Sequence, residues 1–318
     1  MTTHMPVVPA KPAKFMDPDW TANGEARAKV GLKALETLWF NTGTLCNIEC
    51  ENCYILSSPT NDALVYLTVA EVETYLDEIR EQGLATREIG FTGGEPFMNP
   101  DMCAMAEAAL ARGFDVLILT NAMRPMMRPS VQRALARLAG AYGDRLTLRI
   151  SLDHHSAALH DEQRGDGTFE ISLSGMRWLR DTGIRMAVAG RTLWGEDEAT
   201  CRAAFADLFA REEFEIDAAN PGALVLFPEM DEGAEVPEIT TACWGILGKT
   251  PEAVMCSNAR MVVKRRGAAH PVVLACTLLA YDEQFELGRT LSEASRPVPL
   301  NHPHCAKFCV LGGASCSG

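Results

Sequence analysis

Short apolar segments alternate with amphipathic segments through most of the chain, from residue 38 to residue 227. Apolar residues that recur with a period near 3.6 predict helices, and the short apolar runs between them predict buried strands. Regular alternation of strands and helices is typical of a parallel sheet covered by helices, the α/β class. The expected strands are residues 38–41, 88–91, 114–120, 146–152, 184–189 and 223–227, and later helices are expected near residues 101–112, 130–141, 170–181 and 197–211.

The first expected helix carries signals at both of its ends. Thr68 and Glu71 have the spacing of a capping box, in which each side chain bonds to the backbone of the other residue. Gly83 follows the last apolar residue of helical spacing, and glycine is the usual residue just beyond a helix end. The sequence therefore predicts a helix between Thr68 and Gly83.

Three cysteines, Cys46, Cys50 and Cys53, follow the first expected strand in a C-x3-C-x2-C arrangement. Thiolates are soft ligands that suit iron–sulfur clusters. Three thiolates on one loop can hold three irons of a cubane and leave the fourth iron without a protein ligand, as catalytic metal sites generally keep one position open. The alternatives are a zinc knuckle or buried thiols, but no complementary Cys/His pair lies close by in the sequence.

A second motif, FTGGEP over residues 91–96, comes directly after the second expected strand. Taken alone, Gly-Gly-Glu-Pro is a common turn. Its position after a strand and downstream of the three cysteines makes the combination far more specific than either motif. Together the two motifs resemble those of the radical S-adenosylmethionine (SAM) superfamily, and the resemblance extends from about residue 36 to the end of the chain.

The resemblance implies a fold and a chemistry. It implies a partial (β/α)6 TIM-like barrel, which agrees with the strand–helix units counted above, and in such folds the reactive site lies at the carboxyl ends of the strands. It also implies an enzyme with a 4Fe–4S cluster whose open iron binds SAM. An electron from an external donor of the flavodoxin or ferredoxin type then cleaves SAM to a 5′-deoxyadenosyl radical, so that the cofactors carry the difficult step.

The same resemblance assigns roles to residues at the strand ends. Gly93 and Gly94 would let the backbone approach the methionine moiety of SAM, Pro96 would stiffen the turn, and Glu95 would receive the SAM amine. Tyr54 would lie near the adenine. The other expected SAM contacts are Asn121 after the third strand, Ser151 at the end of the fourth, and Arg164 in the run HDEQRG, whose planar fork would pair with the SAM carboxylate.

Further residues near the expected strand ends have weaker assignments. Asp153, His154 and His155 are interpreted either as substrate contacts or as solvated loop residues, and the sequence does not favour one interpretation. Arg191 and Glu229 follow the fifth and sixth strands. In a parallel sheet their position predicts that they point toward the same cavity.

Two cysteines and a methionine-rich stretch are expected to be structural. Cys201 shares the apolar face of an expected helix, and Cys103 lies on the helix after FTGGEP. A free cysteine commonly behaves as a small buried hydrophobe. Residues 123–127 are interpreted as packing, with cavity lining as the alternative.

The last part of the chain, residues 236–318, loses the alternation of strands and helices and is rich in cysteine. Its segment Cys256–Cys276 is similar to the opening of a SPASM or twitch auxiliary-cluster domain, although the spacing after its glycine is longer than usual. The stretch that follows Cys276 and the pair Cys305-x3-Cys309 strengthen the similarity.

This second similarity implies at least one auxiliary 4Fe–4S cluster. Cys316 is an alternative ligand, and Cys243 is a weaker candidate. Two incompletely ligated clusters, or a zinc site that includes His302 and His304, are the alternatives to a single cluster. The favoured ligands are Cys256, Cys276, Cys305 and Cys309.

Composition narrows the class of protein. The 318 residues, 47% of them hydrophobic, suffice for one large domain or two smaller ones. The net charge of −13 argues against sequence-independent binding to nucleic acid. No apolar run approaches the ~20 residues of a membrane span, and the N-terminus lacks a signal-peptide core. Metal ligation in a reducing compartment explains the eleven cysteines better than disulfides do, so we expect a cytoplasmic protein. The expected parts are an N-terminal extension (1–33), the barrel (34–235) and an auxiliary-cluster domain (236–318).

These expectations lead to three functional hypotheses. The leading one is hydrogen abstraction from a small or medium metabolite, with net oxidation or rearrangement. The second is a peptide- or protein-modifying maturase that forms thioether or carbon–carbon bonds. Because only about 35 residues precede the first expected strand, such a maturase would need a separate partner to bind a leader peptide. The third, of another class, is an iron–sulfur electron carrier or redox sensor, which would not need the Gly-Gly-Glu-Pro turn, Ser151 or Arg164.

Overall fold

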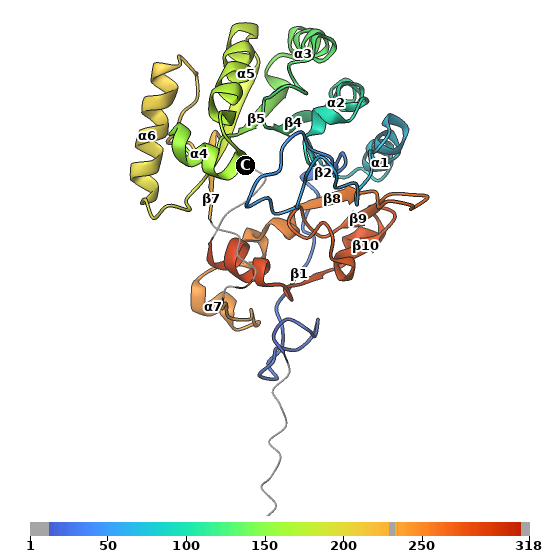
Figure 1. Cartoon of the computed structure of the whole chain (residues 1–318). Helices are drawn as coiled ribbons and strands as arrows, with labels where there is room; N and C mark the ends of the chain where they lie inside the picture. The colour runs from blue at the N-terminus through green and yellow to red at the C-terminus, as the bar shows by residue number, and fades with distance from the viewer. Residues whose placement is uncertain (1–12, 229–232, 234, 313–318) are drawn as a thin grey trace, which may run out of the picture.

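The computed structural model describes residues 13–228, 233 and 235–312, and one curved sheet forms its centre (Figure 1). Within these residues the sheet has nine strands in the order β10-β9-β8-β2-β3-β4-β5-β6-β7. The strands from β8 through β2 to β7 pair in parallel, whereas β9 and β10 are antiparallel to their neighbours. The strands are β2 Thr37–Asn41, β3 Glu88–Thr92, β4 Asp115–Thr120, β5 Leu146–Ser151, β6 Arg185–Arg191, β7 Leu224–Phe227, β8 Ala259–Val263, β9 Val272–Leu274 and β10 Glu286–Gly288.

The expected α/β fold with a parallel sheet is confirmed, and β2 to β7 lie close to the six predicted strands. The sequence did not predict β8, which pairs with the other edge of β2 so that Thr37 lies opposite Ala259 and Phe40 opposite Val262. In the described residues the strand order ends at β10 and β7 without closing on itself. This open sheet is consistent with the expected partial barrel.

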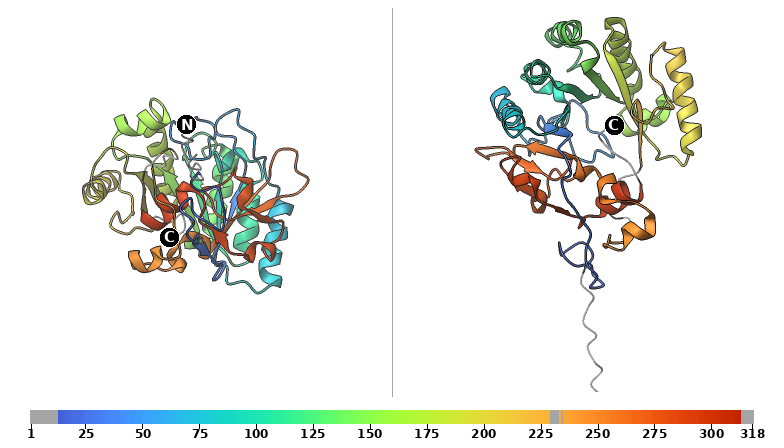
Figure 2. Two further views of the ribbon diagram at one scale, coloured as in Figure 1. Left: turned by 90° about the horizontal axis from the view of Figure 1, so that it is seen from below. Right: turned by 180° about the vertical axis from the view of Figure 1, so that it is seen from behind.

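Helices form an outer row around the parallel strands (Figures 1 and 2). The capping box of Thr68 and Glu71 is present at the start of α1, and Gly83 follows that helix with a φ of 62°. The sequence analysis did not predict α4, which carries the HDEQR run and delivers Arg164 to the edge of the sheet. The helices are α1 Val69–Glu81, α2 Met102–Ala111, α3 Pro129–Tyr142, α4 Ala157–Arg164, α5 Thr168–Thr182, α6 Glu198–Arg211 and α7 Cys243–Leu247.

The core lies between this row of helices and the sheet. All residues of β2 are buried, as expected for a parallel strand that is covered on both faces. The rings of Phe40 and Phe91 stack on neighbouring strands with centroids 5.7 Å apart. Gly90 is required beside them, because a Cβ there would come within 2.3 Å of the Trp39 ring. Cys201 is buried in this core, in agreement with its predicted structural role.

The tail packs against the same sheet and against the N-terminal extension. β1 (Lys29–Val30) pairs with β11 (Val298–Pro299), and Arg27 forms a buried ion pair with Glu238. Because β8 belongs to the central sheet, the tail is joined to the barrel by backbone hydrogen bonds, and the expected domain boundaries stay a prediction. No helix in the described part of the chain is both long and apolar enough for a membrane span. Short 3-10 turns lie at Pro96–Met98, Gly143–Arg145, Pro251–Ala253, Met255–Ser257, Glu283–Phe285 and Glu293–Ser295, and a π-helical turn spans Cys305–Leu311.

Candidate active site

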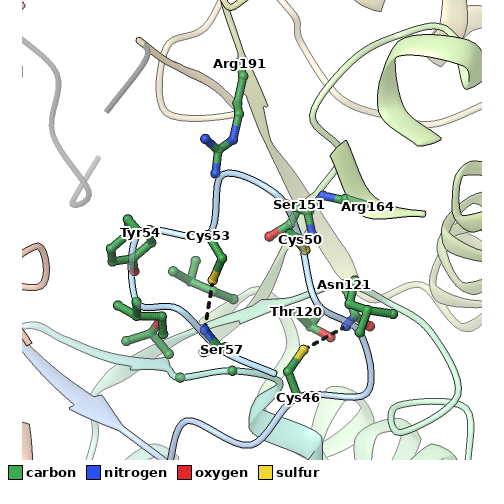
Figure 3. Close-up of a pocket in the computed structure, with 16 residues that line it drawn as sticks. Cys46, Cys50, Cys53, Tyr54, Ser57, Thr120, Asn121, Ser151, Arg164 and Arg191 are labelled. Carbon is green, nitrogen blue, oxygen red and sulfur yellow. Dashed lines mark hydrogen bonds between the residues drawn. The ribbon is translucent and has the colours of Figure 1, made fainter. Parts of the chain in front are cut away.

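The loops after the parallel strands meet at one edge of the sheet and line a pocket with an empty volume of about 630 Å³ (Figure 3). We call it the cysteine pocket. The carboxyl ends of parallel strands share an edge, so residues that are distant in the sequence come together there. Glu95 and Pro96 are not among its lining residues. The predicted residues that do line it are Cys46, Cys50, Cys53, Tyr54, Gly93, Gly94, Asn121, Ser151, Arg164 and Arg191.

The three cysteines face this pocket from the loop between β2 and α1. The Ser57 N–H donates to Cys53 Sγ at 3.4 Å, and Asn121 Nδ2 donates to Cys46 Sγ at 3.9 Å (Figure 3). Burial raises the pKa of Cys46 to about 12 and also raises the pKa of Cys50. Both thiols therefore stay protonated at neutral pH unless a metal supplies compensating positive charge. Three thiols with hydrogen-bond donors aimed at two of their sulfurs fit the ligand set of an iron–sulfur cluster.

His154, His155 and Glu196 form a separate group, in which three possible ligand atoms lie within 4.8 Å of one another.

The Gly93–Gly94 turn packs directly against the cysteine loop. The Gly94 N–H donates to Gly43 O at 2.9 Å, and the Glu95 N–H donates to Leu45 O at 3.1 Å. A Cβ on Gly94 would lie 2.4 Å from Leu45 O, and one on Gly93 would lie 2.5 Å from Gly43 O. Only glycine allows this close approach of two backbones. The turn therefore fixes the cysteine loop and presents its own backbone to the pocket.

Glu95 anchors this turn from behind. Its carboxylate accepts from Thr120 Oγ1 at 2.9 Å, from the Asn121 N–H at 2.8 Å and from the Phe97 N–H at 3.2 Å. Burial raises the pKa of Glu95 to about 7, while these donors oppose the rise. Glu95 thus ties the turn to the end of β4, and its expected contact with the SAM amine stays a prediction. Pro96 begins the following 3-10 turn.

Asp153 joins two arginines beside the cysteines. Arg164 Nε and Nη2 donate to its two carboxylate oxygens at 2.8 and 2.9 Å, and Arg191 Nε donates to Oδ1 at 3.3 Å. Burial alone would raise the pKa of Asp153, but Arg164 and then Arg191 hold it below its usual value. One carboxylate thus serves two guanidiniums, and the wall keeps a net positive charge. Arg191 Nη2 also donates to Asn52 O at 2.9 Å, which ties β6 to the cysteine loop.

The sequence analysis left His154 open between a substrate contact and a solvated loop residue, and the structure places it in neither position. His154 is 2% exposed, hydrogen-bonds through Nδ1 to Ser156 and through Nε2 to Glu196, and does not line the pocket. Glu229 lies outside the described residues. Met123 is buried, and its Sδ accepts from Asn47 Nδ2 at 3.7 Å, so it packs under the cysteine loop.

A second pocket, with an empty volume of about 670 Å³, adjoins the first. The two share Tyr54, Leu119, Ser151, Arg164 and Arg191. We call it the inner pocket. Its remaining wall includes Arg149, Asp153, Phe227, Leu278 and Phe308.

Sequence reasoning missed most of that remaining wall. Arg149 lies two residues before Ser151 on β5, so the two-residue period of the strand places both on one face and was the available signal. Leu278 and Phe308 come from the tail, and the Phe308 ring stacks on Phe227 at 5.7 Å. No local pattern in the sequence indicates these contacts.

Some of the cysteines in the tail lie near one another. Cys256, Cys276 and Cys305 are buried, and Cys305 lies close enough to the other two for their charges to act on it. Cys309 follows Cys305 by one turn of the π-helical segment. Cys243 is engaged separately, accepting from the Thr240 N–H at 3.4 Å. Cys316 lies outside the described residues.

Comparison with protein families matches residues 40–204 to the model of the radical SAM superfamily. The antilisterial bacteriocin subtilosin biosynthesis protein AlbA of Bacillus subtilis is 31% identical over 145 residues, 45% of this chain and 30% of that protein. The mycofactocin maturase MftC of Mycobacterium ulcerans is 31% identical over 154 residues, 48% and 39% of the two chains. The AdoMet-dependent heme synthase of Methanosarcina barkeri is 32% identical over 136 residues, 42% and 36%. The matched segments thus span well under half of these relatives.

Solved structures share the fold. SuiB of Streptococcus suis bound to S-adenosylmethionine aligns with a TM-score of 0.57 at 11% identity, covering 80% of this chain and 63% of that one. Native anSMEcpe with bound AdoMet aligns with a TM-score of 0.58 at 14% identity, covering 85% and 82%. At these identities the likeness is one of fold.

Proposed function

The chain belongs to the radical SAM superfamily, and on this premise we propose that it cleaves SAM at the cysteine pocket and uses the radical on a substrate held in the inner pocket. As a member of that family it is an enzyme with a 4Fe–4S cluster and SAM as cofactors. The observation that carries the proposal is the convergence of Cys46, Cys50 and Cys53 with the Gly93–Gly94 turn on one pocket. When bound, and once reduced by an external electron donor, the cluster would supply the one electron that splits SAM into methionine and a 5′-deoxyadenosyl radical.

The residues of the pocket bind and orient these groups. Cys46, Cys50 and Cys53 hold three irons, and the Asn121 and Ser57 donors steady the sulfurs. The backbone carbonyls of the Gly93–Gly94 turn suit a positively charged amine. The pocket wall formed by Arg164 and Arg191 suits a carboxylate. Asp153 supplies one negative charge against their two positive charges, so one positive charge is left over. Ser151 and the Tyr54 ring remain the proposed partners of the ribose or carboxylate and of the adenine.

The inner pocket is the proposed substrate site. It shares a wall with the cysteine pocket, so a substrate there would lie next to the radical. Its mixture of arginines and apolar side chains admits either a metabolite or a peptide segment. Two of the relatives above are named as a maturase and a bacteriocin biosynthesis protein, and one SuiB structure is titled as bound to a precursor peptide. These names support modification of a peptide at least as well as the small metabolite that the sequence analysis placed first, and the relative named as a heme synthase keeps the metabolite as the second candidate.

We further propose one auxiliary 4Fe–4S cluster held by Cys256, Cys276, Cys305 and Cys309. The support is the burial of Cys256, Cys276 and Cys305 and the closeness of Cys305 to the other two. Leu278 and Phe308 line the inner pocket beside Cys276 and Cys309 in the chain. A cluster there would lie near the substrate, where it could accept an electron from a substrate radical.

The SAM-cleavage proposal is tested by Cys50→Ala. The reconstituted protein with dithionite and SAM should form 5′-deoxyadenosine, and Cys50→Ala should abolish that product, because the cluster loses a ligand. Chromatography of the nucleoside product measures it. Cys201→Ala is the matched control, because Cys201 is a buried thiol of the core and should leave the yield unchanged. Absence of 5′-deoxyadenosine from the unmodified protein would favour an electron carrier instead.

The auxiliary cluster is tested by counting iron in a protein with Cys46, Cys50 and Cys53 all replaced by Ala. One tail cluster predicts about four irons per chain, and two predict about eight. A preparation without iron would remove the auxiliary cluster from the proposal while leaving SAM cleavage at the other site intact.

A further inference from the structure

Arg260 is a charged residue of the tail that the proposed function leaves unexplained. It lies on β8, and its side chain is fully buried and among the largest such side chains in the structure. Taking a guanidinium out of water costs several kcal/mol unless an anion compensates. A buried cation in this position needs a negatively charged neighbour.

The hydrogen bonds of Arg260 involve only neutral carbonyls. Nε donates to Ala294 O at 2.9 Å, and Nη1 donates to Cys256 O at 2.5 Å and to Ala259 O at 2.8 Å. Nη2 is inaccessible to solvent and has no hydrogen-bond partner in the described part of the chain. A buried N–H left without an acceptor is destabilising, so this atom is expected to meet an acceptor that belongs to the complete protein.

Two other arginines with little exposure are paired with acids. Arg27 bonds to Glu238, and Arg164 bonds to Asp153. Within the described residues no carboxylate takes this place for Arg260. Two proposed ligands of the auxiliary cluster lie beside it: Nη1 donates to Cys256 O, and Cys276 comes two residues after Leu274, which pairs with Met261 next to Arg260.

Neutral thiols do not compensate for a buried cation, whereas thiolates bound to irons do. A 4Fe–4S cluster with thiolate ligands carries net negative charge, and its sulfurs accept hydrogen bonds that tune its potential. A cluster at the tail cysteines would therefore supply both an acceptor for Nη2 of Arg260 and the negative charge that its guanidinium lacks.

We propose that Arg260 is a positioning residue of the auxiliary cluster: its Nη2 donates a hydrogen bond to a sulfur on the Cys256–Cys276 side, and its charge offsets that of the cluster. The inference rests on the auxiliary cluster proposed above. A fixed cation stabilises the reduced, more negative form of a cluster, so Arg260 raises the reduction potential. The substrate-facing cluster is thereby made a better electron acceptor.

The test is an EPR-monitored redox titration in the protein with Cys46, Cys50 and Cys53 replaced by Ala, in which only the tail cluster contributes. Arg260→Gln should keep about four irons. At a fixed solution potential, the ratio of reduced to oxidised cluster should fall about tenfold, which for one electron is a shift of about 59 mV to lower potential. Arg260→Lys keeps the charge and should shift less.

Arg202→Gln is the matched control. Arg202 on α6 also donates to two backbone carbonyls, those of Ala218 and Leu224, but Leu224 belongs to β7, which is six strands away from β8 in the sheet. It should leave the potential unchanged. A second measurement uses Arg260 itself: electron–nuclear double resonance on the reduced cluster, with arginine labelled by 15N, should detect a nitrogen or an exchangeable proton beside the cluster.

The outcomes separate the two proposals. Full iron content and an unaltered potential in Arg260→Gln would show that Arg260 only supports the backbone. If Arg260→Gln fails to retain iron, the resonance experiment decides, and the absence of an arginine coupling overturns the role of Arg260. If the parent protein itself holds no iron, the auxiliary cluster fails first and Arg260 loses its proposed partner.

Discussion

Asp153 lies two residues after β5 and forms ion pairs with both Arg164 on α4 and Arg191 on β6. These ion pairs change the role expected for Arg164. The motif around Arg164 predicted a guanidinium that is ready to meet a carboxylate of SAM. In the structure a carboxylate of the protein already holds it, and Arg191 contributes the surplus charge. A single buried acid thus sets the orientation of two cations beside Cys50.

His160, on the same helix as Arg164, makes acid stability testable. Burial, and then the charge of Arg164, lower the pKa of His160 to about 4, whereas an unfolded histidine titrates near 6.5. Between those values the unfolded chain binds the extra proton, so the free energy of unfolding falls as pH drops from about 6.5 to about 4. The loss is on the order of 3 kcal/mol at most, at about 1.4 kcal/mol per pH unit.

Urea unfolding of the iron-free protein at pH 7 and pH 5 measures this effect. His160→Gln should be less sensitive to pH across that interval than the unmodified chain. Equal losses of stability in the two proteins would assign the acid sensitivity to other groups.

At the scale of elements, the cysteine loop owes its position to neighbours on several sides. The Gly93–Gly94 turn holds its beginning, Arg191 holds Asn52, and the Glu51 N–H donates to Gln163 O of α4 at 3.0 Å. Contacts of this kind, made by separate strands and helices, hold the ligands of a metal site in position before the metal binds. The loop itself has little secondary structure, so its shape depends on these contacts.

Gly94→Ala tests the contact between the turn and the loop. The added methyl group would lie 2.4 Å from Leu45 O and must push the two backbones apart. We expect a loss of about 1–3 kcal/mol in the free energy of unfolding together with weaker iron binding at the cysteine loop. Gly140→Ala on α3 is the control, because nothing lies within 4 Å of its Cβ position. Because alanine favours a helix more than glycine does, this control should raise the free energy of unfolding by up to about 1 kcal/mol. Similar melting and iron content in the two variants would contradict the packing argument.

At the scale of the whole molecule, the tail and the barrel share one sheet. β8 pairs with β2 at the strand that carries the cysteine loop, and the tail also supplies Leu278 and Phe308 to the inner pocket. A boundary near residue 235, expected from the end of the alternating pattern, therefore separates segments that are joined by backbone hydrogen bonds.

Truncation after residue 235 tests this dependence. Removing β8 would expose an edge of β2, whose residues are all buried in the complete chain. Exposed apolar edge strands promote aggregation. We expect the truncated chain to lack a cooperative thermal transition, as calorimetry or circular dichroism would show. A truncated chain that melts cooperatively and binds about four irons would establish the barrel as an independent domain.

The sequence alone determined the alternating elements, the capping of α1 and the nearness of the cysteines to Gly93 and Gly94. Each depends on local periodicity or on the rule that parallel strands end at one edge. Only the tertiary structure decided that Glu95 anchors a turn, that Asp153 holds two arginines, and that β8 pairs with β2. These outcomes depend on which distant segments pack together, and burial then selects the partner of each charge. The spacing of residues along the chain carries no signal for such contacts.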